Sequence, residues 1–70
     1  MIMEKKLIPY RIYQARTSRS MSMVELAEML GVSKQLVSQY ENGKTTPSMG
    51  KLNEISNVLK YPISFFYKPL

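Results

Sequence analysis

The chain has 70 residues with ten Lys and Arg against five Asp and Glu, a net charge of +5, so we expect one small basic domain (1–70) that favours a polyanionic partner. It has no Cys and no His, which excludes a disulfide framework, a Cys/His zinc site and catalytic sets built on these residues; we therefore expect no metal and no cofactor. Its apolar runs are short and its N-terminus lacks the pattern of a signal peptide, so we expect a cytoplasmic protein that does not enter a membrane.

The N-terminal part divides into an arm and a first helix. Residues 1–7 have mixed polarity and no cap, which predicts a loose N-terminal arm whose Lys5 and Lys6 either contact phosphate or lie in solvent. From residue 8 to residue 18, Ile8, Ile12 and Ala15 recur at helical spacing, and a proline at position 9 suits a first helical turn. The core of the domain is expected over about residues 8–66.

Two short helices joined by a tight turn follow. Ser22 can cap the first of them, and Glu25 three positions later completes a capping box. Gly31 ends this helix, Ser33 caps the next one, and Gly43 ends that one. The spacing is that of a helix-turn-helix unit.

The second helix of this unit has two chemically different sides. Val37 and Tyr40 share the apolar side. The opposite side carries donors and acceptors able to read base edges in a major groove: Lys34, Gln35, Ser38 and Gln39.

The C-terminal third predicts one regular helix and a short apolar tail. Ser48 can cap a helix over 49–59, after Pro47 has broken the preceding one. The tail 61–70 crowds apolar residues onto one short turn or helix. Because a core this small cannot take them all, some are expected to face a partner.

These features together resemble the phage repressor and Cro type of helix-turn-helix domain, the XRE-like family, over about residues 8–66. The resemblance is carried by Arg16, Ser22, Glu25-Leu26-Ala27, Gly31-Val32-Ser33, Val37-Ser38-Gln39-Tyr40-Glu41-Asn42-Gly43, Pro47, Leu52, Ile55 and Leu59. It implies an all-α, lambda-repressor-like fold of five short helices, with the helix-turn-helix in helices 2 and 3.

The resemblance also implies site residues. The positions that read bases or meet nearby phosphates are Ser33, Lys34, Gln35, Ser38 and Gln39, where Gln suits adenine and Lys suits guanine. Phosphate contacts are expected from the free N–H groups at the start of helix 2 and from the segment after helix 3: Ser22, Met23, Asn42, Lys44 and Thr46. Leu36 either packs on a thymine methyl group or leans on helix 2. Arg16 and Glu41 are implied to form a structural ion pair that fixes helix 3.

The expected function is a sequence-specific double-stranded DNA-binding transcriptional regulator. It is expected to be a repressor of phage or mobile-element type that inserts helix 3, about Lys34–Asn42, in the major groove as a homodimer on a two-fold operator. The alternative is an antitoxin-like protein-interaction module that also binds DNA and holds a protein partner through the apolar segment 61–70. An enzyme is not expected, because the acids stand at capping, outer-face or ion-pair positions.

Overall fold

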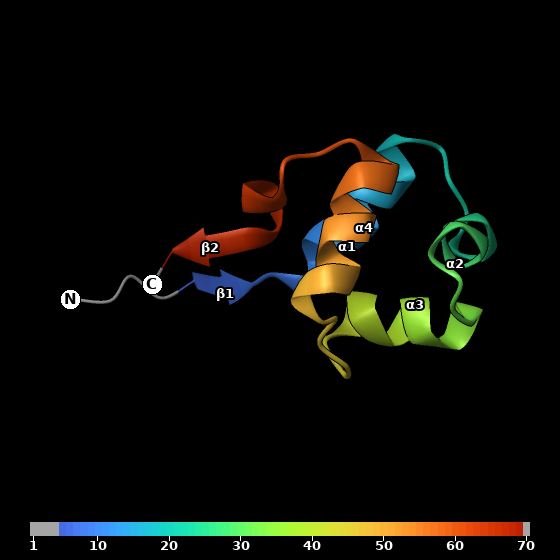
Figure 1. Ribbon diagram of the computed structural model, residues 1–70, viewed down its shortest axis with the longest axis horizontal. Coiled ribbons are helices and arrows are strands. Elements are labelled where there is room, and N and C mark those ends of the chain that lie inside the picture. Colours follow the sequence, from blue (N-terminus) through green and yellow to red (C-terminus); the bar gives the residue numbers. More distant parts are fainter. Residues whose placement is uncertain (1–4, 70) are drawn as a thin grey trace.

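The computed structural model describes residues 5–69, which form a small helical body and a short two-stranded sheet (Figure 1). The elements in chain order are β1 (Lys5–Leu7), α1 (Pro9–Ser18), α2 (Met23–Leu30), α3 (Lys34–Asn42), α4 (Met49–Leu59), the 3₁₀ segment η1 (Ile63–Phe66) and β2 (Tyr67–Pro69). The sheet projects from one end of the helical body.

The helix-turn-helix unit is confirmed, but the prediction of five helices is wrong: the described residues contain four α-helices and one 3₁₀ turn. Pro62 precedes the short segment ISFF, and the chain leaves it in an extended conformation at Tyr67. Four residues between an extended proline and an extended tyrosine form a single tight turn, which is the usual length of a 3₁₀ segment.

The predicted helix ends are confirmed by their caps. Around α2, the Glu25 N–H donates to Ser22 Oγ at 3.0 Å and the Ser22 N–H donates to Glu25 Oε1 at 2.8 Å. Ser33 Oγ accepts the Leu36 N–H at the start of α3. Gly31 and Gly43 close α2 and α3 with φ of +68° and +78°, the left-handed conformation that favours glycine.

The prediction of a loose arm is wrong for residues 5–7; residues 1–4 lie outside the described part of the chain. β1 pairs with β2 in antiparallel register, with Lys6 opposite Lys68 and Leu7 opposite Tyr67. The Ile8 N–H extends the pairing by donating to the Phe66 carbonyl at 2.8 Å. The sequence did not predict this strand for two reasons. Its partner comes from the other end of the chain, and three residues are too few to show the alternating pattern of a strand.

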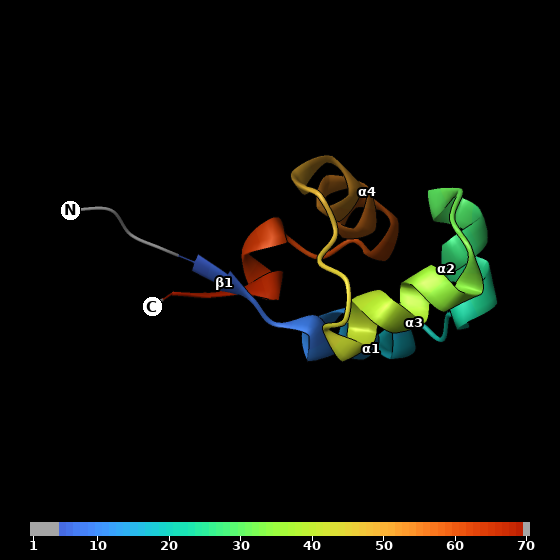
Figure 2. The same ribbon diagram turned by 90° about the horizontal axis from the view of Figure 1, so that it is seen from below.

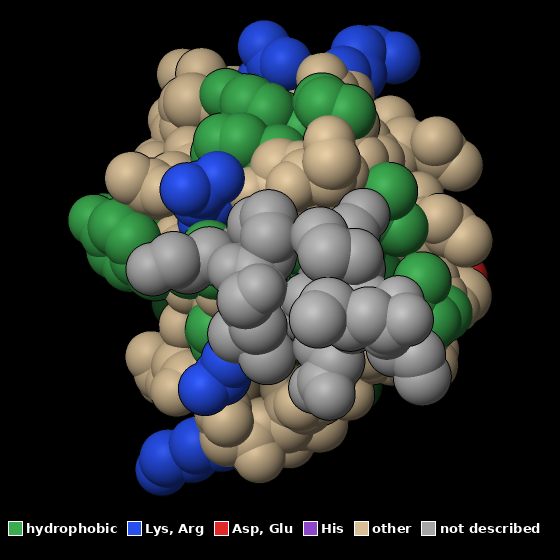
Figure 3. All heavy atoms as spheres, turned by 90° about the vertical axis from the view of Figure 1, so that its left-hand side faces the viewer, with side chains coloured by type: hydrophobic (Ala, Val, Ile, Leu, Met, Phe, Trp, Pro, Cys, Tyr) green, Lys and Arg blue, Asp and Glu red, His purple; other side chains and the backbone are tan. Residues whose placement is uncertain are grey.

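On the two-stranded end of the molecule, the charged side chains in view are almost all basic (Figure 3). Figure 3 looks onto this end and shows Lys and Arg side chains at its rim, with acidic side chains almost out of sight. Lys6 on β1 is among the exposed basic residues of the chain. Among the described residues in this view, the basic side chains therefore meet few acids.

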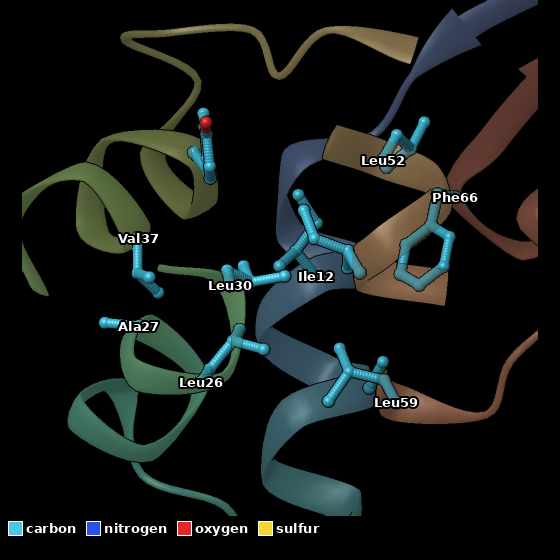
Figure 4. Packing of buried hydrophobic residues seen from close by; sticks show 11 residues of the cluster. Ile12, Leu26, Ala27, Leu30, Val37, Leu52, Leu59 and Phe66 are labelled. Atoms are coloured by element: carbon cyan, nitrogen blue, oxygen red, sulfur yellow. The ribbon is translucent and has the colours of Figure 1, made fainter. Parts of the chain in front are cut away.

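The core is a single cluster that joins all four α-helices to the 3₁₀ segment. Its buried members are Ile12, Ala15, Leu26, Ala27, Leu30, Val37, Tyr40, Leu52, Ile55, Leu59 and Phe66. Figure 4 shows Ile12 of α1 between Leu30 of α2 and the side chains of α4, with Phe66 closing the opposite side. Phe66 is fully buried, and Tyr61, Ile63, Phe65 and Tyr67 are partly buried against the same cluster. The described tail residues therefore mainly cover the core of their own domain.

Two arginines of the α1 region hold this tail in place. Arg11 donates from Nη1 to the Phe65 carbonyl at 2.9 Å, and its guanidinium lies over the Phe65 ring. Arg19 donates from Nε to the Leu59 carbonyl at 2.8 Å and lies over the Tyr61 ring.

Among the described helices, none is both long enough and apolar enough to cross a membrane.

Candidate nucleic-acid interface

α3 lies along one edge of the helical body, where α1 and α2 support its inner side. Val37 and Tyr40 point inward and are buried, at 0% and 5% exposure. Figure 1 places α3 along the lower edge, and Figure 2, which views the molecule from below, shows it on the near side. The outer side of α3 is therefore open to a ligand.

The predicted base-reading residues lie on this outer side or at its start. Lys34, Gln35 and Gln39 are exposed, and Ser38 is partly exposed. Ser33 is exposed at the first cap, where its oxygen already accepts the Leu36 N–H. Leu36 itself is partly buried against the core cluster, which favours the structural alternative for this residue.

At the start of α2, the capping box uses the N–H groups of Ser22 and Glu25. The first turn of a helix leaves further N–H groups without partners inside the helix, here those of Met23 and Val24. The Met23 side chain is partly buried against the core, so this position offers its backbone N–H. Such N–H groups at a helix start can bind an anion.

The negative charge of Glu25 opposes anion binding at the start of α2. Its hydrogen bonds with the backbone and hydroxyl of Ser22 lower the pKa of its carboxyl group. The carboxylate therefore stays ionised at neutral pH beside the positive end of α2.

The end of α3 and the segment after it hold the other predicted phosphate contacts: Asn42 at the last position of α3, and Lys44 and Thr46 beyond it, are all exposed. This segment folds back on the last turn of α3, because the N–H groups of Lys44 and Thr45 both donate to the Gln39 carbonyl, at 3.0 and 3.3 Å. The Thr45 hydroxyl also donates to the side-chain oxygen of Gln39 at 3.1 Å. Sequence reasoning missed Thr45. The only signal it offered was a hydroxyl residue shortly after a helix-ending glycine.

Arg16 and Glu41 form the ion pair that the resemblance implies. Arg16 Nε lies 2.6 Å from Glu41 Oε2, and Nη2 donates to Oε1 at 3.0 Å, so the contact is bidentate. Arg16 Nη1 donates to the Met21 carbonyl at 2.9 Å, and its guanidinium lies over the Tyr13 ring. The hydrogen bond to Glu41 raises the pKa of Arg16, which keeps the guanidinium charged. The pair therefore joins α1 to α3 and neutralises an acid that would otherwise repel phosphate near the outer face.

The sequence matches a known protein family and an uncharacterized regulator. The family model that matches, HTH_3, is described as helix-turn-helix and covers residues 12–66. An uncharacterized HTH-type transcriptional regulator from Sinorhizobium medicae is 38% identical over 58 residues, which covers 83% of this chain and 42% of that protein. The chain therefore spans less than half the length of that curated relative.

The fold was compared with solved structures. The P22 c2 repressor in complex with a synthetic operator matches with a TM-score of 0.79 at 28% identity, over 87% of this chain and 92% of that chain. SinR of Bacillus subtilis, described as the master regulator for biofilm formation and crystallised with DNA, matches with a TM-score of 0.73 at 38% identity, over 81% of this chain and 92% of that one.

Proposed function

The chain belongs to the helix-turn-helix family of transcriptional regulators, and we propose that it binds double-stranded DNA in a sequence-specific way with α3 in the major groove. The observation that carries this proposal is the outer face of α3, where polar side chains are exposed while the inner face is buried and braced by the Arg16–Glu41 pair. A helix held in this way presents a fixed set of polar groups to base edges.

The exposed groups of α3 have the chemistry that base reading needs. Lys34 can donate to guanine O6 and N7, and the amides of Gln35 and Gln39 can bond to base edges. A good bidentate contact discriminates against a wrong base by about 1–3 kcal/mol. A few such contacts are enough to prefer one site over random DNA.

The flanks of α3 supply contacts that hold the domain on the duplex without reading sequence. The N–H groups of Met23 and Val24 can bind a phosphate at the start of α2. Asn42 at the end of α3, and Lys44 and Thr46 after it, can contact further phosphates. A net charge of +5 attracts the polyanion from a distance. In the proposed mechanism, phosphate contacts fix the position of the domain on the duplex, and the side chains of α3 then bind the base edges in the major groove.

We also propose that two copies act together, on a two-fold operator with half-sites roughly 34 Å apart. The likeness to the P22 c2 repressor bound to an operator supports a repressor of phage or mobile-element type. With DNA as the partner, the proposed location is the cytoplasm. The antitoxin-like alternative is not carried forward, because it depends on a free apolar tail and the described tail residues cover the core.

The proposal is tested by fluorescence anisotropy of the 70-residue chain with labelled duplexes. Affinity for random duplex DNA should fall as salt rises from about 50 to 200 mM, because phosphate contacts release counterions. Absence of binding to any duplex at low salt would refute the proposal.

A pair of matched variants then tests the role of α3. Gln35→Ala should lower the affinity for a preferred site about 5- to 150-fold while leaving random DNA and folding unchanged. Gln14→Ala, an exposed glutamine on α1 outside the interface, is the control and should change neither. If Gln35→Ala instead lowered the affinity equally for all DNA sequences, Gln35 would contact the DNA backbone and not a base.

A further inference from the structure

Asn42, the last residue of α3, and Thr45, in the turn after it, make hydrogen bonds to side chains on the outer face of α3. The Thr45 hydroxyl donates to Gln39 Oε1 at 3.1 Å, six positions back in the chain. Asn42 donates from Nδ2 to Ser38 Oγ at 3.4 Å. Two of the four polar residues on the outer face are therefore already engaged by their neighbours before any DNA binds.

The backbone holds Thr45 in the position that this contact requires. The N–H groups of Lys44 and Thr45 both donate to the Gln39 carbonyl, so the segment is anchored to the same residue whose side chain Thr45 touches. The reversal begins at Gly43, with φ of +78° and so little space that an added Cβ would lie 3.2 Å from the Pro9 ring. A constrained turn that packs on α1 therefore positions the Thr45 hydroxyl beside Gln39.

These contacts leave donors on the outer face. With the oxygen end of the Gln39 amide held toward Thr45, its NH₂ group is the end left for a ligand. The Ser38 oxygen accepts from Asn42, which leaves its O–H to donate. Lys34 has three donors and no acceptor. Lys34, Ser38 and Gln39 therefore form a surface that donates hydrogen bonds.

We propose that Thr45 is a positioning residue that turns the NH₂ end of the Gln39 amide toward the ligand, so that Gln39 selects a base edge rich in acceptors, guanine above all. Guanine offers two acceptors, N7 and O6, on its major-groove edge, and thymine offers O4. Adenine and cytosine each present an NH₂ donor there, which would face two other donors, the Lys34 ammonium and the NH₂ group of Gln39. The adenine preference expected for glutamine from sequence is replaced at Gln39 by a preference for guanine or thymine. This inference rests on the proposed function.

The first test uses the unaltered 70-residue chain. Sites are selected from a random duplex pool, and the position read by Gln39 is identified as the one whose preference disappears when the selection is repeated with Gln39→Ala. The inference expects guanine or thymine there. It further expects affinity to fall when a guanine at that position is replaced by 7-deazaguanine, which lacks the N7 acceptor. Adenine at this position would overturn the inference and leave the proposed function intact, whereas failure to bind any duplex would remove the proposed function itself.

The second test compares Thr45→Val, which keeps the shape and loses the hydroxyl, with Thr45→Ser, which keeps the hydroxyl. Thr45→Val should lower the affinity for the selected site roughly 2- to 12-fold, the range expected when one flexible side chain must be ordered on binding. It should also weaken the preference at the Gln39 position alone, and Thr45→Ser should behave like the unaltered chain. An equal loss on selected and random DNA would make Thr45 a phosphate contact, and no change would make it idle; either result would overturn the inference.

Discussion

Replacing Glu41 by Gln tests how α3 is held against α1. The substitution keeps the shape of the side chain and removes the negative charge that faces Arg16. Both side chains of the pair are largely buried, with exposed fractions of 9% and 7%. Breaking a buried ion pair from one side typically costs 3–5 kcal/mol, because the remaining charge stays buried without a counter-charge. The Gln oxygen can still accept one of the two hydrogen bonds, so we expect a loss of about 2–3 kcal/mol in the free energy of unfolding.

Thermal unfolding followed by circular dichroism measures this loss. For a domain of this length, 1 kcal/mol corresponds to a shift in Tm of about 4–8 °C, so Glu41→Gln should melt about 8–24 °C below the unaltered chain. Glu54→Gln is the matched control, since Glu54 pairs with Lys51 at 3.3 Å but has 52% of its side chain exposed. An exposed pair contributes about 0–1 kcal/mol, so the control should melt within a few degrees of the unaltered chain.

The result that would refute this reasoning is a Glu41→Gln domain with unchanged melting and lost DNA binding. Such a domain would show that Glu41 acts at the DNA, and that α3 is held by its apolar contacts alone. If the Arg16–Glu41 pair holds α3 in place, Glu41→Gln should lower both the melting temperature and the affinity for DNA, and the affinity should recover at lower temperature.

Three further predictions concern the tail, the turn after α3 and the cap of α2. Phe66→Ala should lose about 3–5 kcal/mol in urea unfolding because Phe66 is fully buried, and a loss below about 1 kcal/mol would contradict its role in the core. Gly43→Ala should destabilise the domain by about 1 kcal/mol or more, and Gly31→Ala by less. Both glycines have positive φ, but only at Gly43 would the added Cβ lie close to another side chain, 3.2 Å from the Pro9 ring, so equal losses would show that φ alone matters. The lowered pKa of Glu25 means that its carboxylate stabilises the fold above the ordinary glutamate pKa of about 4.3, and that this contribution is lost as the pH falls through the lowered value. Glu25→Gln should therefore show a flatter fall of Tm as the pH drops below about 4.3, and identical slopes would contradict the capping role.

Features encoded within a few neighbouring residues were predictable from sequence. Ser22 and Glu25 specify their cap by spacing alone, and Gly31 and Gly43 stop helices because they adopt positive φ at little cost. The two sides of α3 follow from helical periodicity, since Val37 and Tyr40 need burial and the polar residues do not.

Features that depend on residues far apart in the chain were not predictable in this way. β1 and β2 pair across nearly the whole length of the chain, and neither segment is long enough to show a strand pattern. Phe66 enters the core only because the chain returns past α1 after Pro62, which no local pattern records. Thr45 reaches Gln39 through a turn whose geometry depends on Gly43 and on two backbone hydrogen bonds.

The central claim is that the outer face of α3 reads sequence in duplex DNA, and selection of bound sites from a random duplex pool tests it most directly. We predict that the 70-residue chain enriches one motif, arranged as two inverted half-sites about one helical turn apart. With Gln35→Ala the preference at one position of the motif should be lost, and with Gln14→Ala the motif should be unchanged. A pool that stays random after repeated rounds, while salt-sensitive binding persists, would contradict the claim and leave only non-specific attraction to a polyanion.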